Sequence, residues 1–172
     1  EKHPEIQFLP KEEIKKYQEG RLKEALEYVW NKSPYYRNIY TQKGIDINRI
    51  RTLEDLCQLP VTTKSDLQLH GNEFRCVAPE DIIDYATTSG TLGDPVTFTE
   101  TEEDLCHLAY NEQLSFQTAG CTKQDILQEM VTIDRRFMAG LAYFLGAREL
   151  GMGVVRVGNG IPELQWDTIN RI

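Results

Sequence analysis

Apolar residues in the first part of the chain recur at helical spacing. Between residues 14 and 30 they fall at a spacing of about 3.6 residues, with one gap at Gly20 and Arg21, which places them on one face of an α-helix that follows Pro10. Ser33 is a capping residue, and Pro34 occupies the favoured first position of a second helix. Gly44 is a typical stop for that helix. The pattern therefore predicts two successive helices.

Two short helical turns are predicted next. Thr52 is followed three residues later by Asp55, and Thr63 is followed in the same way by Asp66. Each pair approximates a capping box at the start of a helix. Between the two turns the residue before Pro60 is expected to be extended, because proline disfavours the helical conformation of the residue it follows.

The second part of the chain alternates between strand-like and helix-like runs. Strands and helices that alternate at this spacing favour a parallel sheet with right-handed crossovers. The predicted strands cover 82–87, 95–99, 126–133 and 154–157, and the predicted helices cover 101–119, 136–150 and 162–171. The side chains expected to face inward from the helix over 136–150 are Phe137, Leu141, Phe144, Leu145 and Leu150. The predicted fold class is α/β, with a helical N-terminal segment over 1–80 and part of a parallel β-sheet with flanking helices over 81–172.

Charge and length limit the kinds of partner. Lysine and arginine number 19 against 27 aspartates and glutamates, a net charge of −8 over 172 residues, which disfavours broad nucleic-acid binding. No apolar run approaches the roughly 18 residues of a membrane span, so no membrane partner is expected. The chain opens on Glu1 rather than Met, so this end is expected to be a cut.

Cysteine and histidine spacing does not indicate a metal site. No two of the four cysteines lie within four residues of each other, so the chain has no zinc-knuckle motif. His70 and His107 have no partner at the spacing of a metal site or a catalytic triad. Without a signal peptide, the thiols are expected to be reduced and the protein cytoplasmic. We assign no catalytic residue and no metal ligand from these patterns.

The segment most suggestive of chemistry is the loop over residues 87–95. Gly90 and Gly93 permit positive φ and close backbone approach, and successive N–H groups in such a turn can form a nest for phosphate oxygens. The loop is not a Walker A motif, because no lysine follows its second glycine. A flexible hairpin turn remains the alternative interpretation. The hydroxyl donors of this loop are Thr88, Ser89 and Thr91.

The loop and the segments around it resemble a known family. TTSGTLGDPVTFT is similar to the phosphate-binding signature of the adenylate-forming superfamily, which includes acyl-CoA synthetases, luciferases and adenylation domains. Four further segments resemble the phenylacetate-CoA ligase branch, and the resemblance spans roughly residues 30–160. These segments are SPYYRNIYTQKGID, TLEDLCQLPVTTKSDL, EDIIDYATTSGT and FMAGLAYFLGARELGMGVVRVGNG.

This resemblance implies ATP-dependent activation of an aryl carboxylate. In that branch the carboxylate attacks the α-phosphorus of ATP, pyrophosphate leaves, and coenzyme A captures the acyl-adenylate. Preorganised donors in the loop would stabilise the charge that builds on the departing pyrophosphate, and Mg²⁺ would bridge phosphate oxygens. The partners implied are thus a small-molecule carboxylate and a nucleotide. The residues implied to contact the phosphates are Thr88, Ser89, Gly90, Thr91 and Gly93.

The sequence departs from the family in two loop positions and in length. Leu92 stands where the family usually has serine or threonine, and Asp94 stands where many members have lysine. The family's later motifs, including its lid lysine, cannot be placed in 172 residues. The chain is therefore expected to be an N-terminal fragment, inactive alone, with cut sheet edges that favour homo-oligomers. Two alternatives stay open: a non-catalytic or degenerate binding module, and an adenylating enzyme with an acceptor other than coenzyme A.

Two segments in the second part of the chain have a functional alternative to a structural role. Residues 134–136, Asp-Arg-Arg, precede a predicted helix and are either a surface charge cluster or a contact for a phosphate of ATP or coenzyme A. Residues 158–160, Gly-Asn-Gly, follow a predicted strand and are either a simple turn or part of a ligand site. The second interpretation is possible because ligands of open parallel sheets bind at the carboxyl ends of strands.

Overall fold

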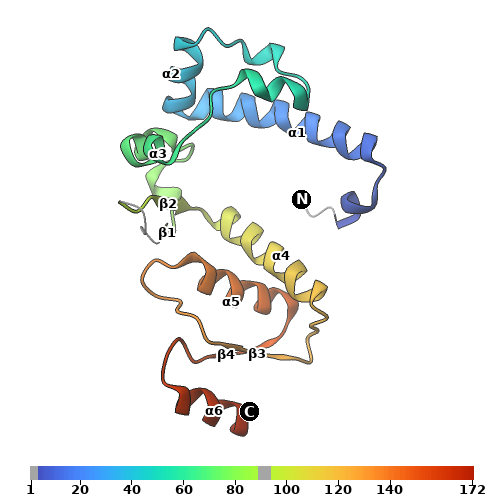
Figure 1. The fold of residues 1–172 in the computed structure, drawn as a ribbon, viewed down its shortest axis with the longest axis vertical. Helices are drawn as coiled ribbons and strands as arrows, with labels where there is room; N and C mark the ends of the chain where they lie inside the picture. Colours follow the sequence, from blue (N-terminus) through green and yellow to red (C-terminus); the bar gives the residue numbers. More distant parts are fainter. Residues whose placement is uncertain (1–3, 89–93) are drawn as a thin grey trace. The chain divides into compact units, whose positions relative to one another are not determined.

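The computed structural model describes residues 4–88 and 94–172, which form two compact units divided after Ala78 (Figure 1). The predicted loop residues Ser89, Gly90, Thr91, Leu92 and Gly93 lie outside the described residues. The first unit contains η1 (Pro4–Phe8), α1 (Lys11–Lys32), α2 (Pro34–Gln42), η2 (Ile47–Arg49), η3 (Leu53–Gln58), α3 (Lys64–His70) and η4 (Gly71–Phe74). The second contains η5 (Pro79–Asp81), β1 (Asp84–Thr87), β2 (Thr97–Glu100), α4 (Glu102–Thr118), β3 (Ile126–Glu129), α5 (Met138–Leu150), β4 (Gly153–Arg156) and α6 (Pro162–Arg171).

The first unit is held by a small apolar core beneath α1. Leu26 of α1, Tyr40 of α2 and Ile50 are buried together, with half-buried apolar side chains packed around them. Local signals define the ends of the elements, as the sequence predicts. Both predicted capping boxes are present, at the starts of η3 and α3.

Ser33 links the start of α2 to a distant part of the same unit. Its side chain is completely buried, and its hydroxyl oxygen accepts a hydrogen bond from the N–H of Tyr36 at 3.4 Å. The same hydroxyl donates to the carbonyl of Glu73 at 3.0 Å. Nearby, the ring of Tyr35 stacks on Phe74 with centroids 4.0 Å apart. The cap predicted from Ser33-Pro34 is confirmed, and it also fixes η4 against α2.

The second unit contains two separate pairs of strands. β3 and β4 are parallel, with Ile126 opposite Gly153 and Glu129 opposite Arg156, which confirms the predicted parallel pairing. β1 and β2 form their own antiparallel pair, because the connection between them is short and a parallel pair would need a long crossover. The predicted α/β class is confirmed, but the expected parallel sheet is limited to β3 and β4, since β1 and β2 form a separate antiparallel pair. Each strand has four residues, so β1, β2 and β3 are shorter than predicted, while β4 has the predicted length and begins one residue earlier.

Small residues allow α4 and α5 to pack closely side by side (Figure 1). A Cβ added at Gly146 of α5 would overlap Glu112 of α4, and one at Gly140 would overlap the carbonyl oxygen of Thr132. The buried positions of α5 are accordingly small, and include Ala142 and Ala147. The close approach of these helices leaves no room for larger side chains at the contact.

The beginning of α5 differs from the sequence prediction. The helix starts at Met138 and not at Arg136, because Arg135 and Arg136 both have φ of 60° and leave the helical conformation. Phe137, predicted to face inward, is 43% exposed. The prediction was wrong because the apolar spacing of this segment carries no sign of a left-handed turn.

The last helix buries polar side chains and exposes apolar ones. α6 lies on the opposite side of β3 and β4 from α5 (Figure 1), and its buried side chains are the polar Gln165 and Thr168. Its large apolar side chains face solvent, and Trp166 is 65% exposed. The Gln165 side chain is satisfied internally, since it accepts from Gln128 and donates to the carbonyls of Gly158 and Gly160.

Candidate functional site

Two hydrogen bonds connect the two sides of the predicted phosphate loop at its base, where β1 ends and β2 begins. The N–H of Thr88 donates to the carbonyl of Val96, and the N–H of Val96 donates to the hydroxyl oxygen of Thr88, both at 3.0 Å. Val96 and Ala86 are buried, so packing fixes both sides of the base. These contacts join Thr88, which follows β1, to Val96, which precedes β2.

Of the five predicted phosphate contacts, Thr88 is the one that the structure describes. Its main-chain N–H is already used by Val96 and is therefore unavailable to a phosphate. Its hydroxyl oxygen accepts from the N–H of Val96, which leaves the hydroxyl hydrogen able to donate to an oxyanion. Asp94, on the return side of the loop, is exposed.

Another backbone contact joins the end of β1 to the loop that precedes α5. The N–H of Thr87 donates to the carbonyl of Arg136 at 2.9 Å. Arg135 and Arg136 have positive φ, which costs a non-glycine residue roughly 1–2 kcal/mol each. Strain of this kind is typical of functional segments. The contact brings the 134–136 segment, for which the sequence left a functional interpretation open, next to the base of the phosphate loop.

A hollow of about 440 Å³ opens where the parallel strands end. We call it the strand-end hollow, and it is lined by residues 131–135, which follow β3, and by residues 156–159 at the end of β4. Ligands of open parallel sheets bind at this position. The hollow therefore brings together the two segments, 134–136 and 158–160, that sequence analysis considered separately, although Arg136 and Gly160 do not line it.

Positively charged side chains lie at this hollow. Arg156, the last residue of β4, places its guanidinium 5.2 Å from the ring centroid of Phe144 in α5. Arg135 has its Nε 3.9 Å from the carboxylate of Asp134. Thr132 also hydrogen-bonds Asp134 through its hydroxyl. Sequence reasoning missed Arg156, because its relation to Arg135 depends on the parallel register of β3 and β4.

Glu129 is a buried acid beside the same strand ends. It is 2% exposed, and neither carboxylate oxygen has a hydrogen-bond partner among the described residues. Burial raises the pKa of Glu129 above its usual value, and the nearby charge of Arg156 partly opposes that shift. The raised pKa favours the neutral acid. A second buried acid, Glu100 of β2, has a pKa raised by burial and by the charges of Asp84 and Asp104.

Among the residues that the structure describes, the remaining titratable groups form no further recognisable centre. Within residues 4–88 and 94–172, no three His, Cys, Asp or Glu side chains are arranged to hold a metal ion. All four cysteines are free thiols in the structure. In the same ranges, no helix is long and apolar enough to cross a lipid bilayer.

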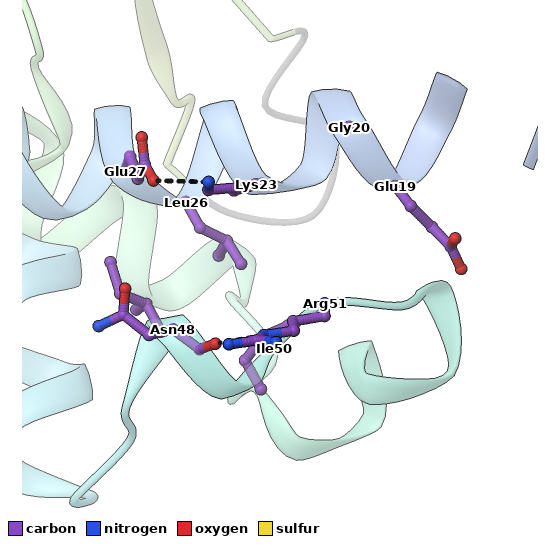
Figure 2. A pocket seen from close by; sticks show the side chains of 9 residues that line it. Glu19, Gly20, Lys23, Leu26, Glu27, Asn48, Ile50 and Arg51 are labelled. Carbon is purple, nitrogen blue, oxygen red and sulfur yellow. Dashed lines mark hydrogen bonds and ion pairs between the residues drawn. The ribbon is translucent and has the colours of Figure 1, made fainter. Parts of the chain in front are cut away.

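Another hollow of about 440 Å³ lies in the first unit, beside α1 (Figure 2). Its walls combine the apolar side chains of Leu26 and Ile50 with charged groups of both signs, including Lys23 and Glu27, whose atoms lie 3.9 Å apart. The mixed charge favours no particular ligand, and none of the predicted site residues lines this hollow.

Comparisons with known proteins identify relatives over most of the chain. No family model matches it. The phenylacetate-coenzyme A ligase of Thermus thermophilus is 35% identical over 163 residues, which cover 94% of this chain and 36% of that enzyme. The phenylacetate-coenzyme A ligase of Escherichia coli is 29% identical over 155 residues, or 90% of this chain and 35% of the enzyme. The chain thus spans about a third of the length of these relatives.

Solved structures with the same fold are acyl-CoA ligases. An open conformation of 2-hydroxyisobutyryl-CoA ligase, solved with 2-HIB-AMP and CoA, has a TM-score of 0.86 at 23% identity. That comparison covers 97% of this chain and 40% of the ligase. A structure of the same ligase in the postadenylation state with 2-HIB-AMP has a TM-score of 0.83. The resemblance predicted from the sequence is confirmed: over most of its length the chain is homologous to phenylacetate-CoA ligases, and it has the fold of the corresponding part of an adenylate-forming acyl-CoA ligase.

Proposed function

We propose that the chain is the N-terminal, phosphate-binding part of an ATP-dependent, AMP-forming ligase that joins an aryl carboxylate to coenzyme A. The observation that carries this proposal is the 35% identity with a phenylacetate-coenzyme A ligase over 94% of the chain. The two hydrogen bonds between Thr88 and Val96 support it, because a phosphate-binding loop must hold its donors in fixed positions. Within the chain, residues 81–172 form the nucleotide-binding part and residues 1–80 the helical part.

The loop's role is to stabilise the pyrophosphate that leaves when the carboxylate attacks ATP. Donors fixed before the reaction stabilise developing charge without reorganising. Thr88 contributes its hydroxyl hydrogen, since its amide is engaged by Val96. Mg²⁺, when bound, neutralises phosphate charge. The proposed phosphate contacts are Thr88, Ser89, Gly90, Thr91 and Gly93.

The test is pyrophosphate exchange that depends on an aryl acid. The complete protein that carries this chain should exchange labelled pyrophosphate into ATP when phenylacetate or a related acid is present, and residues 1–172 alone should not. Ser89→Ala and Thr91→Val should each lower the exchange rate by roughly tenfold or more, because each removes a donor to the leaving group. Thr97→Val, an exposed position of β2, is the matched control and should leave the rate unchanged. Absence of exchange with a broad panel of aromatic and aliphatic acids would refute the proposal.

Asp94 and Leu92 favour a second candidate, a non-catalytic or degenerate binding module. An acidic side chain in place of lysine beside a polyphosphate weakens its binding. This candidate predicts a folded protein whose melting temperature ATP does not change. An adenylating enzyme with another acceptor is distinguished by its product, which would be an ester or amide in place of the coenzyme A thioester.

We also propose a cytoplasmic location and no nucleic-acid or membrane partner. The four free thiols suit a reducing compartment, and the net charge of −8 opposes binding to a phosphate backbone. Homo-oligomers are proposed because the strands of both pairs have open edges and α6 exposes apolar side chains.

A further inference from the structure

The strand-end hollow has positive charge that the proposed loop contacts do not use. Its lining contains two guanidinium groups, from Arg135 and Arg156, and one carboxylate, from Asp134. The lining itself therefore has a net charge of about +1, with the buried carboxyl group of Glu129 near Arg156, in a chain whose overall charge is −8. Such a local excess of positive charge favours an anionic ligand over a neutral one.

We propose that Arg135 and Arg156 bind a phosphate group in this hollow. Arg156 is held on the face of Phe144, at 5.2 Å from its ring centroid, and its charge also acts on the nearby buried carboxyl group of Glu129. Arg135 belongs to the loop that follows β3, and its Nε lies 3.9 Å from a carboxylate oxygen of Asp134. Two guanidinium groups at one hollow suit a phosphate, which has several oxygens to accept their hydrogen bonds.

The position of the hollow links it to the proposed reaction, and the inference rests on that proposed function. The hydrogen bond of 2.9 Å from Thr87 to Arg136 fixes the arginine-bearing loop beside the base of the phosphate loop. The left-handed backbone of Arg135 and Arg136 is maintained there despite its cost. The volume of about 440 Å³ lies within the range of small-molecule sites. These arginines would supply positive charge near a loop whose return side has the acidic residue Asp94.

The same structure offers matched variants that separate charge from folding. Arg135→Gly and Arg136→Gly both place glycine at a left-handed position, so both relieve the same backbone strain, but Arg136 does not line the hollow. Arg156→Gln and Arg148→Gln both remove a guanidinium from the ring of Phe144, at 5.2 Å and 5.6 Å, but Arg148 does not line the hollow. Circular dichroism of each variant reports whether it folds.

The test is isothermal titration calorimetry, which measures the affinity of the 172-residue chain for three probes. Pyrophosphate represents the nucleotide, coenzyme A represents the second substrate, and phenylacetate has a carboxylate but no phosphate. We expect Arg135→Gly and Arg156→Gln each to weaken binding of one phosphate probe by roughly three- to tenfold, and the two control variants to bind as the unsubstituted chain does. The probe that loses affinity identifies the source of the phosphate.

Three results would overturn this site: no binding of either phosphate probe, equal losses in test and control variants, or a loss confined to phenylacetate. None of them decides the proposed function, which is measured separately as pyrophosphate exchange by the complete protein. Conversely, a protein without exchange activity could still bind phosphate through these arginines, and the two proposals therefore fail independently.

Discussion

The side-chain amide of Gln128 in β3 donates a hydrogen bond to the side-chain oxygen of Gln165 in α6, with 2.7 Å between the two atoms. The amide of Gln165 in turn donates to the carbonyl of Gly158 at 2.8 Å. α6 is therefore attached to the sheet by polar contacts, while its apolar residues lie in solvent. Exposed apolar side chains outside the folded core contribute little to stability, and buried hydrogen-bonded amides contribute more.

Because α6 buries polar side chains and exposes apolar ones, we expect substitution of a polar residue to lower the free energy of unfolding more than substitution of a large apolar residue. Gln165→Ala should lower the free energy of unfolding by about 1–3 kcal/mol, because it leaves the Gln128 amide without that acceptor in a half-buried site. Trp166→Ala, which removes a far larger apolar side chain, should change it by less than about 0.5 kcal/mol. Chemical denaturation at low protein concentration measures both values. A larger loss for Trp166→Ala than for Gln165→Ala would contradict the observed orientation of the helix.

Much of the local structure could be predicted from the sequence, because its signals are local. The Thr63–Asp66 capping box and the Ser33-Pro34 start of α2 depend on residues within one helical turn, and both are present. The left-handed turn at Arg135 and Arg136 could not be predicted, since neither residue type favours it and a hydrogen bond from distant Thr87 accompanies it.

The candidate site was predictable only in part for a similar reason. The loop that follows Thr88 is identified by a contiguous motif, and its flanking strands were expected on both sides. The strand-end hollow depends on the pairing of Glu129 with Arg156 across separate strands, which sequence order alone does not show. Its two contributing segments were recognised as candidates, but their proximity comes from the parallel register.

The helical glycines predict opposite effects of alanine in the two units. Gly140→Ala in α5 should destabilise the second unit by at least about 3 kcal/mol, because the new Cβ would overlap the carbonyl oxygen of Thr132 and the backbone has little room to move. Gly20→Ala in α1 meets no atom within 4 Å and should stabilise the first unit by about 0.5–1 kcal/mol. Native-state hydrogen exchange assigns each change to its unit. Similar effects of the two substitutions would argue against the tight approach at Gly140.

The buried Glu129 predicts a stability that falls as the pH rises. Burial raises its pKa in the folded chain above that of an unfolded glutamate, so between these two values the folded state binds more protons. The free energy of unfolding therefore decreases as the pH increases from about 4 through the raised pKa. Glu129→Gln removes the buried charge and should raise the melting temperature at pH 7 by roughly one to a few degrees.

The pH dependence of that difference is the decisive measurement. At pH 4 and below, Glu129 is mostly protonated in the folded chain, so the gain from Glu129→Gln should shrink towards zero. Glu80→Gln, at an exposed position of the same unit, serves as the control and should give a much smaller difference at either pH. A gain from Glu129→Gln that is equally large at pH 4 and pH 7 would show that relief of buried charge is not its cause.

Ser33 predicts a loss of stability from the removal of a single oxygen atom. Ser33→Ala abolishes the acceptor for the Tyr36 N–H and the donor to the Glu73 carbonyl in a completely buried position. The loss of a helix cap and of a buried hydrogen bond should lower the free energy of unfolding of the first unit by about 1–3 kcal/mol. Ser65→Ala, at an exposed position in α3, should change it by less than about 0.5 kcal/mol. Hydrogen exchange of the α2 amides compares the two variants, and equal protection in both would contradict a structural role for the Ser33 hydroxyl.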